Sequence, residues 1–106
     1  ADKPIINGDS AFTMVTTTMP RPYGPVADNL KQRIAWTMEF FQKAFSRPDF
    51  VGWHYCGLID ADNRNASKTG RQHSGLVDGL GVPDMDLQRA IRQCSDDLYA
   101  TATQRL

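Results

Sequence analysis

The sequence predicts an α/β fold in which parallel strands alternate with helices. Short apolar runs suited to buried strands alternate along the chain with longer segments of helical periodicity, and a long loop follows each strand. A strand, a loop and a helix that occur twice in succession imply parallel strands joined by right-handed crossovers. Because two strands cannot shield both the faces and the edges of a sheet, the fold is expected to need further strands.

The first predicted unit covers residues 1–48. The apolar run Pro4–Asn7 suits a buried strand, and residues 10–27 lack periodicity and are rich in proline, which predicts a long loop. A helix is expected from Asp28, as its N-cap, to Phe45. Its apolar residues recur at steps of three and four, at Leu30, Ile34, Met38, Phe41 and Phe45.

The second unit, residues 49–106, repeats this plan. Phe50–Ile59 is aromatic and β-branched and almost free of charge, as a strand covered on both faces should be. Residues 60–71 are polar and predict an exposed loop, and residues 72–77 predict a short extended return. The last helix is expected from Asp84 to the C-terminus, with one apolar face made by Leu87, Ala90, Ile91, Cys94 and Leu98.

The composition is that of an ordinary globular protein, with 41% hydrophobic residues and a net charge of zero. This charge balance gives no reason to expect a nucleic acid or a membrane as partner. The N-terminus has neither an initiator methionine nor a signal sequence, which fits a fragment or a processed chain. Cys56 and Cys94 lie in apolar patterns, so both are expected to be free, buried thiols.

Three motifs in order resemble one family of enzymes. The stretch Lys3–Ser10 (KPIINGDS) resembles the seventh strand of retaining glycoside hydrolases of the large (β/α)8 clan, where K-P-hydrophobic-hydrophobic-x-G-E ends in the nucleophilic Glu. Phe50–Tyr55 (FVGWHY) resembles the eighth strand, nearest to the β-agarase-like branch with its V-G-W-H-Y run. Ser74–Asp78, followed by Gly81–Pro83, is similar to the G-L-V-D-x-x-G-x-P passage before the last helix of those barrels.

The resemblance implies the last two βα units of a TIM (β/α)8 barrel, incomplete in this chain, with the seventh unit at 1–48 and the eighth at 49–106. Such a barrel needs ~250 residues, so the implied partners are the remainder of the barrel, in the same parent chain or another, and a polysaccharide or oligosaccharide. No cofactor is implied. Because polymer-degrading enzymes are usually exported, the resemblance favours a secreted or periplasmic location.

Asp9 is the candidate catalytic residue, since the resemblance places it where the family has its nucleophilic Glu. In the retaining reaction this carboxylate forms a glycosyl-enzyme intermediate. Asp is shorter than Glu by one C–C bond, about 1.5 Å, and the family's acid/base Glu on the fourth strand has no counterpart in this chain. Two alternatives for Asp9 stay open: a carboxylate in an inactive sugar site, and a side chain that caps the turn after Gly8.

Further candidates for substrate binding follow the second strand. Trp53 and Tyr55 alternate with His54, so the two aromatic rings face one way and the imidazole faces the other. The resemblance implies an aromatic sugar platform here, whereas the alternative is packing between the barrel and its helices. A polar cluster of Arg71, Gln72, His73 and Ser74 either binds sugar hydroxyls or pins the loop.

Metal binding is not expected, because His54, Cys56 and His73 match no usual ligand spacing. The sequence therefore predicts part of an agarase-like glycoside hydrolase that is not a complete enzyme alone. Two alternatives remain: a carbohydrate-binding pseudoenzyme, and a small α/β domain without catalysis that oligomerises through its open sheet edges.

Overall fold

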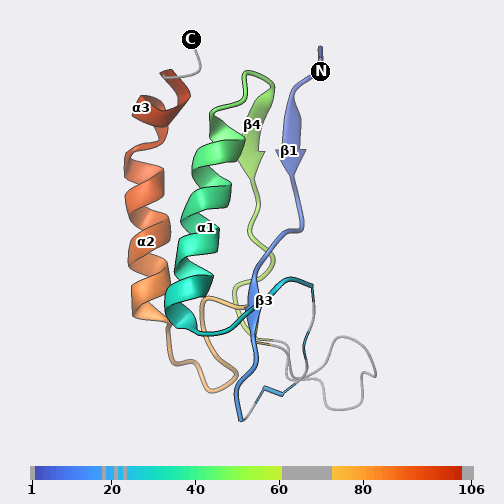
Figure 1. Cartoon of the computed structure of the whole chain (residues 1–106), viewed down its shortest axis with the longest axis vertical. Coiled ribbons are helices and arrows are strands. Elements are labelled where there is room, and N and C mark those ends of the chain that lie inside the picture. The colour runs from blue at the N-terminus through green and yellow to red at the C-terminus, as the bar shows by residue number, and fades with distance from the viewer. Residues whose placement is uncertain (1, 18, 21, 23, 61–72, 104–106) are drawn as a thin grey trace.

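The computed structural model describes residues 2–17, 19–20, 22, 24–60 and 73–103. Within these residues, four short strands and three helices form a mixed α/β arrangement, in the order β1 (Ile5–Asn7), β2 (Thr13–Met14), β3 (Val26–Ala27), α1 (Leu30–Phe45), β4 (Phe50–Trp53), α2 (Met85–Asp96) and α3 (Leu98–Thr103). In Figure 1, β1 and β4 lie side by side and point the same way, while α1 and α2 run back beside them. Both chain termini lie at the end where these helices finish.

The predicted parallel pairing is confirmed by β1 and β4. Ile5 is opposite Phe50 and Asn7 is opposite Trp53, with an irregularity in the register after Ile5. The predicted length of the second strand was wrong, because the ladder ends at Trp53. The His54 N–H still donates to the carbonyl of Asn7 at 2.7 Å. Because β1 ends at Asn7, residues 55–59 of the apolar run are not paired with β1.

The first loop contains more regular structure than predicted. Within residues 10–27, β2 and β3 pair in parallel, with Thr13 opposite Val26 and Met14 opposite Ala27. The Thr13 hydroxyl adds a hydrogen bond of 3.2 Å to the carbonyl of Pro25. In residues 72–77, predicted as an extended return, His73 forms a single antiparallel bridge with Met14. The two loops therefore contact each other.

Helix α1 begins one residue later than predicted. Asn29, not Asp28, is the N-cap: its backbone is extended, and its amide oxygen accepts from the Gln32 N–H at 2.8 Å. The Gln32 side chain accepts in turn from the Asp28 N–H at 2.7 Å, so one backbone donor of the first turn and one just before the N-cap are both satisfied. Asn and Asp are about equally good N-caps, so the sequence alone did not separate the neighbours.

The C-terminal helix is divided in two. Asp84 caps α2 through its carboxylate, which accepts from the Leu87 N–H at 3.2 Å. Helix α2 ends at Asp96, and the carbonyl of its C-cap residue, Asp97, accepts from the Thr101 N–H in α3. The single predicted helix is therefore corrected to two helices with a break at Asp97. None of the helices in the described ranges is long and apolar enough to cross a membrane.

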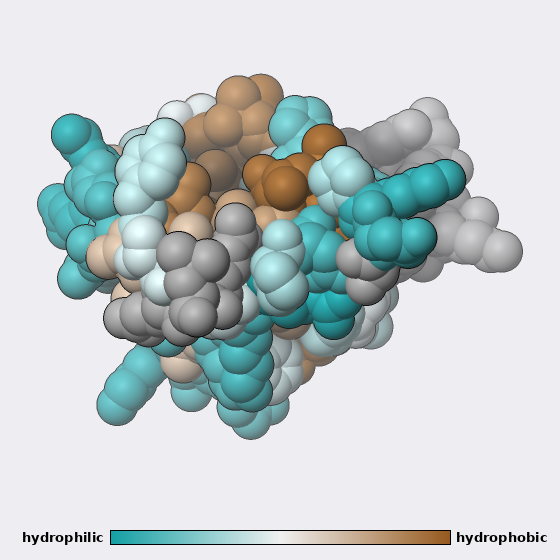
Figure 2. Space-filling model, turned by 90° about the horizontal axis from the view of Figure 1, so that it is seen from above, coloured by the Kyte–Doolittle hydropathy of each residue, from teal (hydrophilic) through white to brown (hydrophobic). Residues whose placement is uncertain are grey.

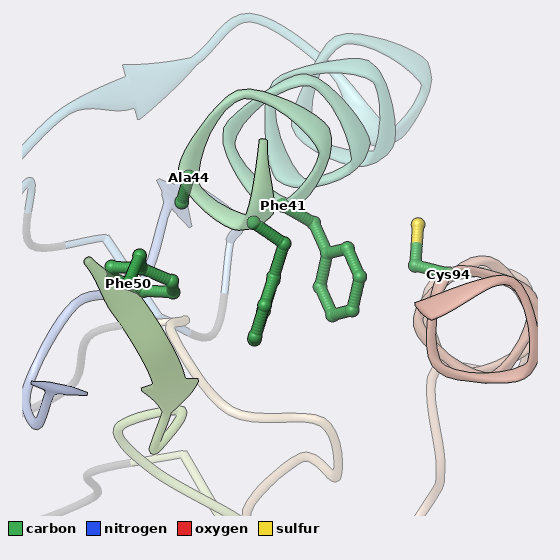
Figure 3. Packing of buried hydrophobic residues seen from close by; sticks show 5 residues of the cluster. Phe41, Ala44, Phe50 and Cys94 are labelled. Atoms are coloured by element: carbon green, nitrogen blue, oxygen red, sulfur yellow. The ribbon is translucent and has the colours of Figure 1, made fainter. Parts of the chain in front are cut away.

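The hydrophobic core lies between α1, β4 and α2. It is built from aromatic and small side chains, namely Phe41, Ala44, Phe45, Phe50 and Cys94. Figure 3 shows Phe41 between α1 and the helix that carries Cys94, while Ala44 and Phe50 lie on the side of β4. The Phe45 and Phe50 rings meet edge to face, with centroids 4.9 Å apart. This cluster fixes the sheet against α1.

Apolar residues remain exposed on the strands. Ile6 is 67% exposed on β1 and Val51 is 53% exposed on β4. Viewed from the end that holds the termini, hydrophobic surface lies open between hydrophilic flanks (Figure 2). The core thus covers one side of the strands and leaves apolar groups on the strands in contact with solvent.

Candidate functional site

The carboxyl ends of β1 and β4 meet at one end of the sheet, and Asp9 lies just beyond β1. The amide oxygen of Asn7 accepts from the N–H groups of Asp9, at 3.2 Å, and of Ser10, at 3.1 Å. Asn7 therefore caps this turn through its side chain, as Asn commonly does. The carboxylate of Asp9 is exposed and available for other contacts.

Cys56 contacts Asp9 across the two segments. A hydrogen bond between the Cys56 thiol and the Asp9 carboxylate raises the pKa of the thiol, because the S–H donates to the anion and because a nearby negative charge disfavours the thiolate. Cys56 is a free thiol, as expected, but it is exposed rather than buried, whereas Cys94 is buried. The apolar run that predicted burial of Cys56 extends beyond the end of β4, where the covering strand is lost.

Trp53 packs between the sheet and α1. Its indole N–H donates to the carbonyl of Ser10 at 3.1 Å. Its ring lies edge-on to Phe40 with centroids 4.7 Å apart, and 5.5 Å from the ring of Tyr55. These contacts occupy much of the ring, which is half-buried.

Tyr55 shares the side of Trp53, as the alternation predicted, and its hydroxyl is held from two sides. Its oxygen accepts from Arg33 Nη2 at 3.2 Å, and its O–H donates to the carbonyl of Ser74 at 3.1 Å. Burial is the main reason that the pKa of Tyr55 lies above its ordinary value. Tyr55 thus joins the segment after β4 to α1.

His54, between these two aromatic residues, is exposed. Its backbone N–H completes the ladder to Asn7, so the residue is anchored although its side chain is open to solvent. Asp9 and His54 therefore present a carboxylate and an imidazole from the ends of adjacent parallel strands. With the exposed Cys56 thiol beside Asp9, these groups supply the reactive side chains described at this end of the sheet.

His73 is held by charged neighbours. Its Nδ1 lies 2.6 Å from Asp60 Oδ2, and its Nε2 lies 3.2 Å from Arg33 Nη1. Because a guanidinium can only donate, Nε2 accepts and the proton of a neutral imidazole resides on Nδ1, where it is donated to Asp60. Of the other members of the predicted polar cluster, Ser74 accepts from the Tyr55 hydroxyl through its backbone carbonyl, and Arg71 and Gln72 lie outside the described residues.

Arg33 is the functional-site residue that sequence reasoning missed. It is fully buried, and its Nη1 lies 3.6 Å from Asp84 Oδ2 at the start of α2. A signal was present: Arg33 and Thr37 lie eight and four residues before Phe41, and therefore on the face of α1 that Phe41 buries. Periodicity alone treats a charged residue on such a face as solvent-exposed.

The segment after residue 73 approaches Asp60 very closely. The Gly75 N–H donates to Asp60 Oδ1 at 2.8 Å. A side chain at Gly75 would place its Cβ 2.6 Å from the Asp60 nitrogen and 2.9 Å from the Val77 oxygen. Gly is therefore required here by close contact with backbone atoms.

A separate groove of about 570 Å³ lies along α1 beside β1. Its floor is mainly aromatic, with Phe12, Trp36, Phe40 and Phe50, and charged residues such as Lys43 stand at its rim. The lining contains neither Asp9 nor His54. Within the described ranges, no three His, Cys, Asp or Glu side chains gather in a way that could hold a metal ion.

No protein-family model matches the sequence, and no curated protein matches it. Among solved structures, the fold is similar to that of PfGH50B, with a TM-score of 0.84 and 20% identity over 95% of this chain and 15% of that chain. An exo-β-agarase has a TM-score of 0.84 and 22% identity, over 95% of this chain and 14% of its own. The agarase AgWH50C has a TM-score of 0.83 and 21% identity, over 93% and 14% respectively.

These similarities define the chain as an α/β unit with the fold of one part of the agarases. The resemblance to agarase-like glycoside hydrolases that the three motifs predicted is thereby confirmed at the level of the fold. The chain spans about 15% of the length of the structures that it matches. At identities near 20%, the similarity establishes the fold and leaves the chemistry to the site residues.

Proposed function

We propose that this chain forms the last two βα units of a (β/α)8 glycoside hydrolase that acts on an agar-type polysaccharide. Residues 1–48 would be the seventh unit and residues 49–106 the eighth. One observation carries the proposal: adjacent parallel strands bring Asp9 and His54 to the same end of a fold shared with agarases. In barrels of this kind the active site forms at the carboxyl ends of the strands.

In this proposal Asp9 is the nucleophile, and the acid/base carboxyl group comes from the remainder of the barrel. A retaining site holds its two carboxyl groups ~5–5.5 Å apart. Asp has one methylene fewer than the Glu of the family, so the sugar would bind closer to β1 than in its relatives. Support comes from the exposure of Asp9 and from the fact that Asn7 performs the capping that would otherwise occupy the carboxylate.

The proposed sugar subsite is centred on His54. Its exposed imidazole can exchange hydrogen bonds with sugar hydroxyls. The Trp53 ring packs against Phe40 on the opposite side of the strand, so Trp53 stays in the proposal as a second candidate contact, through the exposed part of its ring. Tyr55 and His73 are held next to this subsite by their hydrogen bonds with Arg33. Arg71 and Gln72 stay in the proposal as candidates from the loop that precedes His73.

The alternative function is sugar binding without catalysis. It is favoured by one contact, the hydrogen bond between Asp9 and the Cys56 thiol, which occupies part of the carboxylate. A carboxylate committed to a neighbour is a poorer nucleophile than a free one, because its lone pairs and charge are partly satisfied. The two functions differ in turnover rather than in sugar affinity.

The test is the release of reducing ends from agarose by the intact protein. Asp9→Asn should lower kcat by about 10⁴-fold or more if Asp9 is the nucleophile, whereas Asp96→Asn on the exposed surface of α2 should leave it unchanged. A protein that binds agaro-oligosaccharides but shows no turnover, and gains turnover in Asp9→Glu, would establish the pseudoenzyme.

Native mass spectrometry covers the remaining alternative. A chain found only as an assembly of 106-residue copies, without affinity for agarose, would refute both sugar-based functions. It would leave the small self-associating α/β domain as the function of this fold.

A further inference from the structure

A single buried guanidinium joins the segments that follow β1 and β4. Arg33 is 0% exposed, and its Nε donates to the carbonyl of Phe12 at 2.8 Å. Its Nη2 donates to the Tyr55 hydroxyl at 3.2 Å and to the carbonyl of Gly75 at 2.9 Å. Phe12 lies three residues after Asp9, and Tyr55 directly follows His54. One side chain on α1 therefore holds both segments that carry the proposed site.

The segment that carries Asp9 is anchored on both sides. Before Ser10, the Asn7 side chain holds the turn. After it, the Phe12 ring packs edge-on against Trp36, with centroids 5.8 Å apart, and the Phe12 carbonyl is bound by Arg33. Little freedom remains between these anchors, so a displacement of the Phe12 carbonyl is passed to Asp9.

The charge of Arg33 is balanced locally, which allows its complete burial. Asp84 Oδ2 lies 3.6 Å from Nη1. His73 bridges Nη1 to Asp60, since its Nε2 accepts from Arg33 while its Nδ1–H donates to Asp60. The planar fork of Arg can address several acceptors in fixed directions, whereas the Lys ammonium is a compact group that cannot reach them all.

We propose that Arg33 is a positioning residue that sets the location of Asp9 relative to His54 and Cys56. It acts through the Phe12 carbonyl on one segment and the Tyr55 hydroxyl on the other. The expected effect of Arg33 on catalysis rests on the proposed function. The effect of Arg33 on the position of Asp9 relative to the segment after β4 can be measured without any substrate.

The substrate-free experiment uses the Cys56 thiol as a reporter in the intact protein. The rate of alkylation by iodoacetamide is followed at the Cys56 peptide by mass spectrometry, which separates it from the buried Cys94. The Asp9→Asn variant serves as the reference, since it gives the alkylation rate of Cys56 in the absence of the carboxylate contact. Arg33→Lys should raise the rate toward that of Asp9→Asn, because a thiol without the carboxylate contact has a lower pKa and forms the reactive thiolate more readily.

Phe45→Leu is the matched control, because it weakens the core at the far end of α1 and leaves the Arg33 contacts in place. At an equal loss in Tm, it should leave the Cys56 rate unchanged. An Arg33→Lys rate equal to that of the unmodified protein would overturn the proposal and reduce Arg33 to a stabilising role. If Arg33→Lys does not fold, Tyr55→Phe replaces it, with the same two outcomes.

The activity arm separates this inference from the proposed function. In an active hydrolase, Arg33→Lys should lower kcat several-fold more than Phe45→Leu at equal folded fraction, with a smaller change in KM. If the intact protein has no turnover on agarose, the proposed catalysis fails, and the alkylation rates alone decide whether Arg33 positions Asp9. Equal kcat values for the two variants would contradict the positioning role in an active enzyme.

Discussion

The two ends of α1 are held in opposite ways. Toward its C-terminus, Phe41 and Phe45 pack against Phe50 of β4 through contacts that depend on shape and apolar area. Toward its N-terminus, Arg33 is buried in hydrogen bonds, and Thr37 donates back to the Arg33 carbonyl at 2.8 Å. Apolar packing is non-directional, so it stabilises the helix without fixing the orientation of neighbouring groups. The hydrogen bonds of Arg33 do fix the orientation of their partners, but burying the guanidinium costs desolvation free energy. The proposed site lies at the polar end.

The largest expected effect tests the polar end. Arg33→Met removes the cation from between Asp60 and Asp84 and leaves buried acceptors without donors. We expect a loss of about 3–5 kcal/mol in the free energy of unfolding, measured by urea denaturation. A loss below about 1 kcal/mol would mean that solvent screens this cluster as it screens surface ion pairs.

The apolar end should tolerate a change of shape better. Phe41→Met keeps the residue apolar and near its original volume, so the expected cost is below about 1.5 kcal/mol by the same measurement. A cost equal to that of Arg33→Met would remove the distinction between the two ends. Phe41→Ala serves as the reference for a true cavity, at about 3–5 kcal/mol.

The N-cap provides a finer test at the polar end. Asn29→Ala removes the acceptor for the Gln32 N–H and should cost about 1 kcal/mol. Asp28→Ala is the matched control, since Asp28 contacts the Gln32 side chain through its backbone N–H, which alanine keeps. Thermal unfolding followed by circular dichroism can resolve the two. Equal losses of stability in the two variants would mean that the Asp28 side chain contributes to the cap as much as that of Asn29.

The smallest effect concerns alkaline pH. Burial raises the pKa of Tyr55 in the folded protein, so its contribution to stability is complete below the unfolded pKa of about 10 and is lost as pH rises through the folded value. Tyr55→Phe should therefore flatten the fall in stability above about pH 10. Denaturation midpoints at pH 8 and at higher pH measure this, and an unchanged slope would contradict a buried hydroxyl.

The contrast between the ends also explains what the sequence could predict. The repeat of apolar residues from Leu30 to Phe45 predicted α1, because helical packing depends on local spacing. The side-chain hydrogen bonds of Arg33 involve residues 21 to 42 positions away in the sequence, beyond any local pattern. The position of Asp9 was predicted from its motif, whereas its contact with Cys56 depends on where β4 ends. That end is set by the length of β1, which the apolar run Phe50–Ile59 does not encode.

The exposed apolar residues on β1 and β4 have a practical consequence for expression. Ile6 and Val51 are more than half exposed, on short strands that pair only with each other among the described elements. Sheet edges and apolar faces of this kind promote association between copies of a chain. A recombinant polypeptide limited to these 106 residues should therefore accumulate in inclusion bodies. The double substitution Ile6→Lys with Val51→Lys should shift it into the soluble fraction.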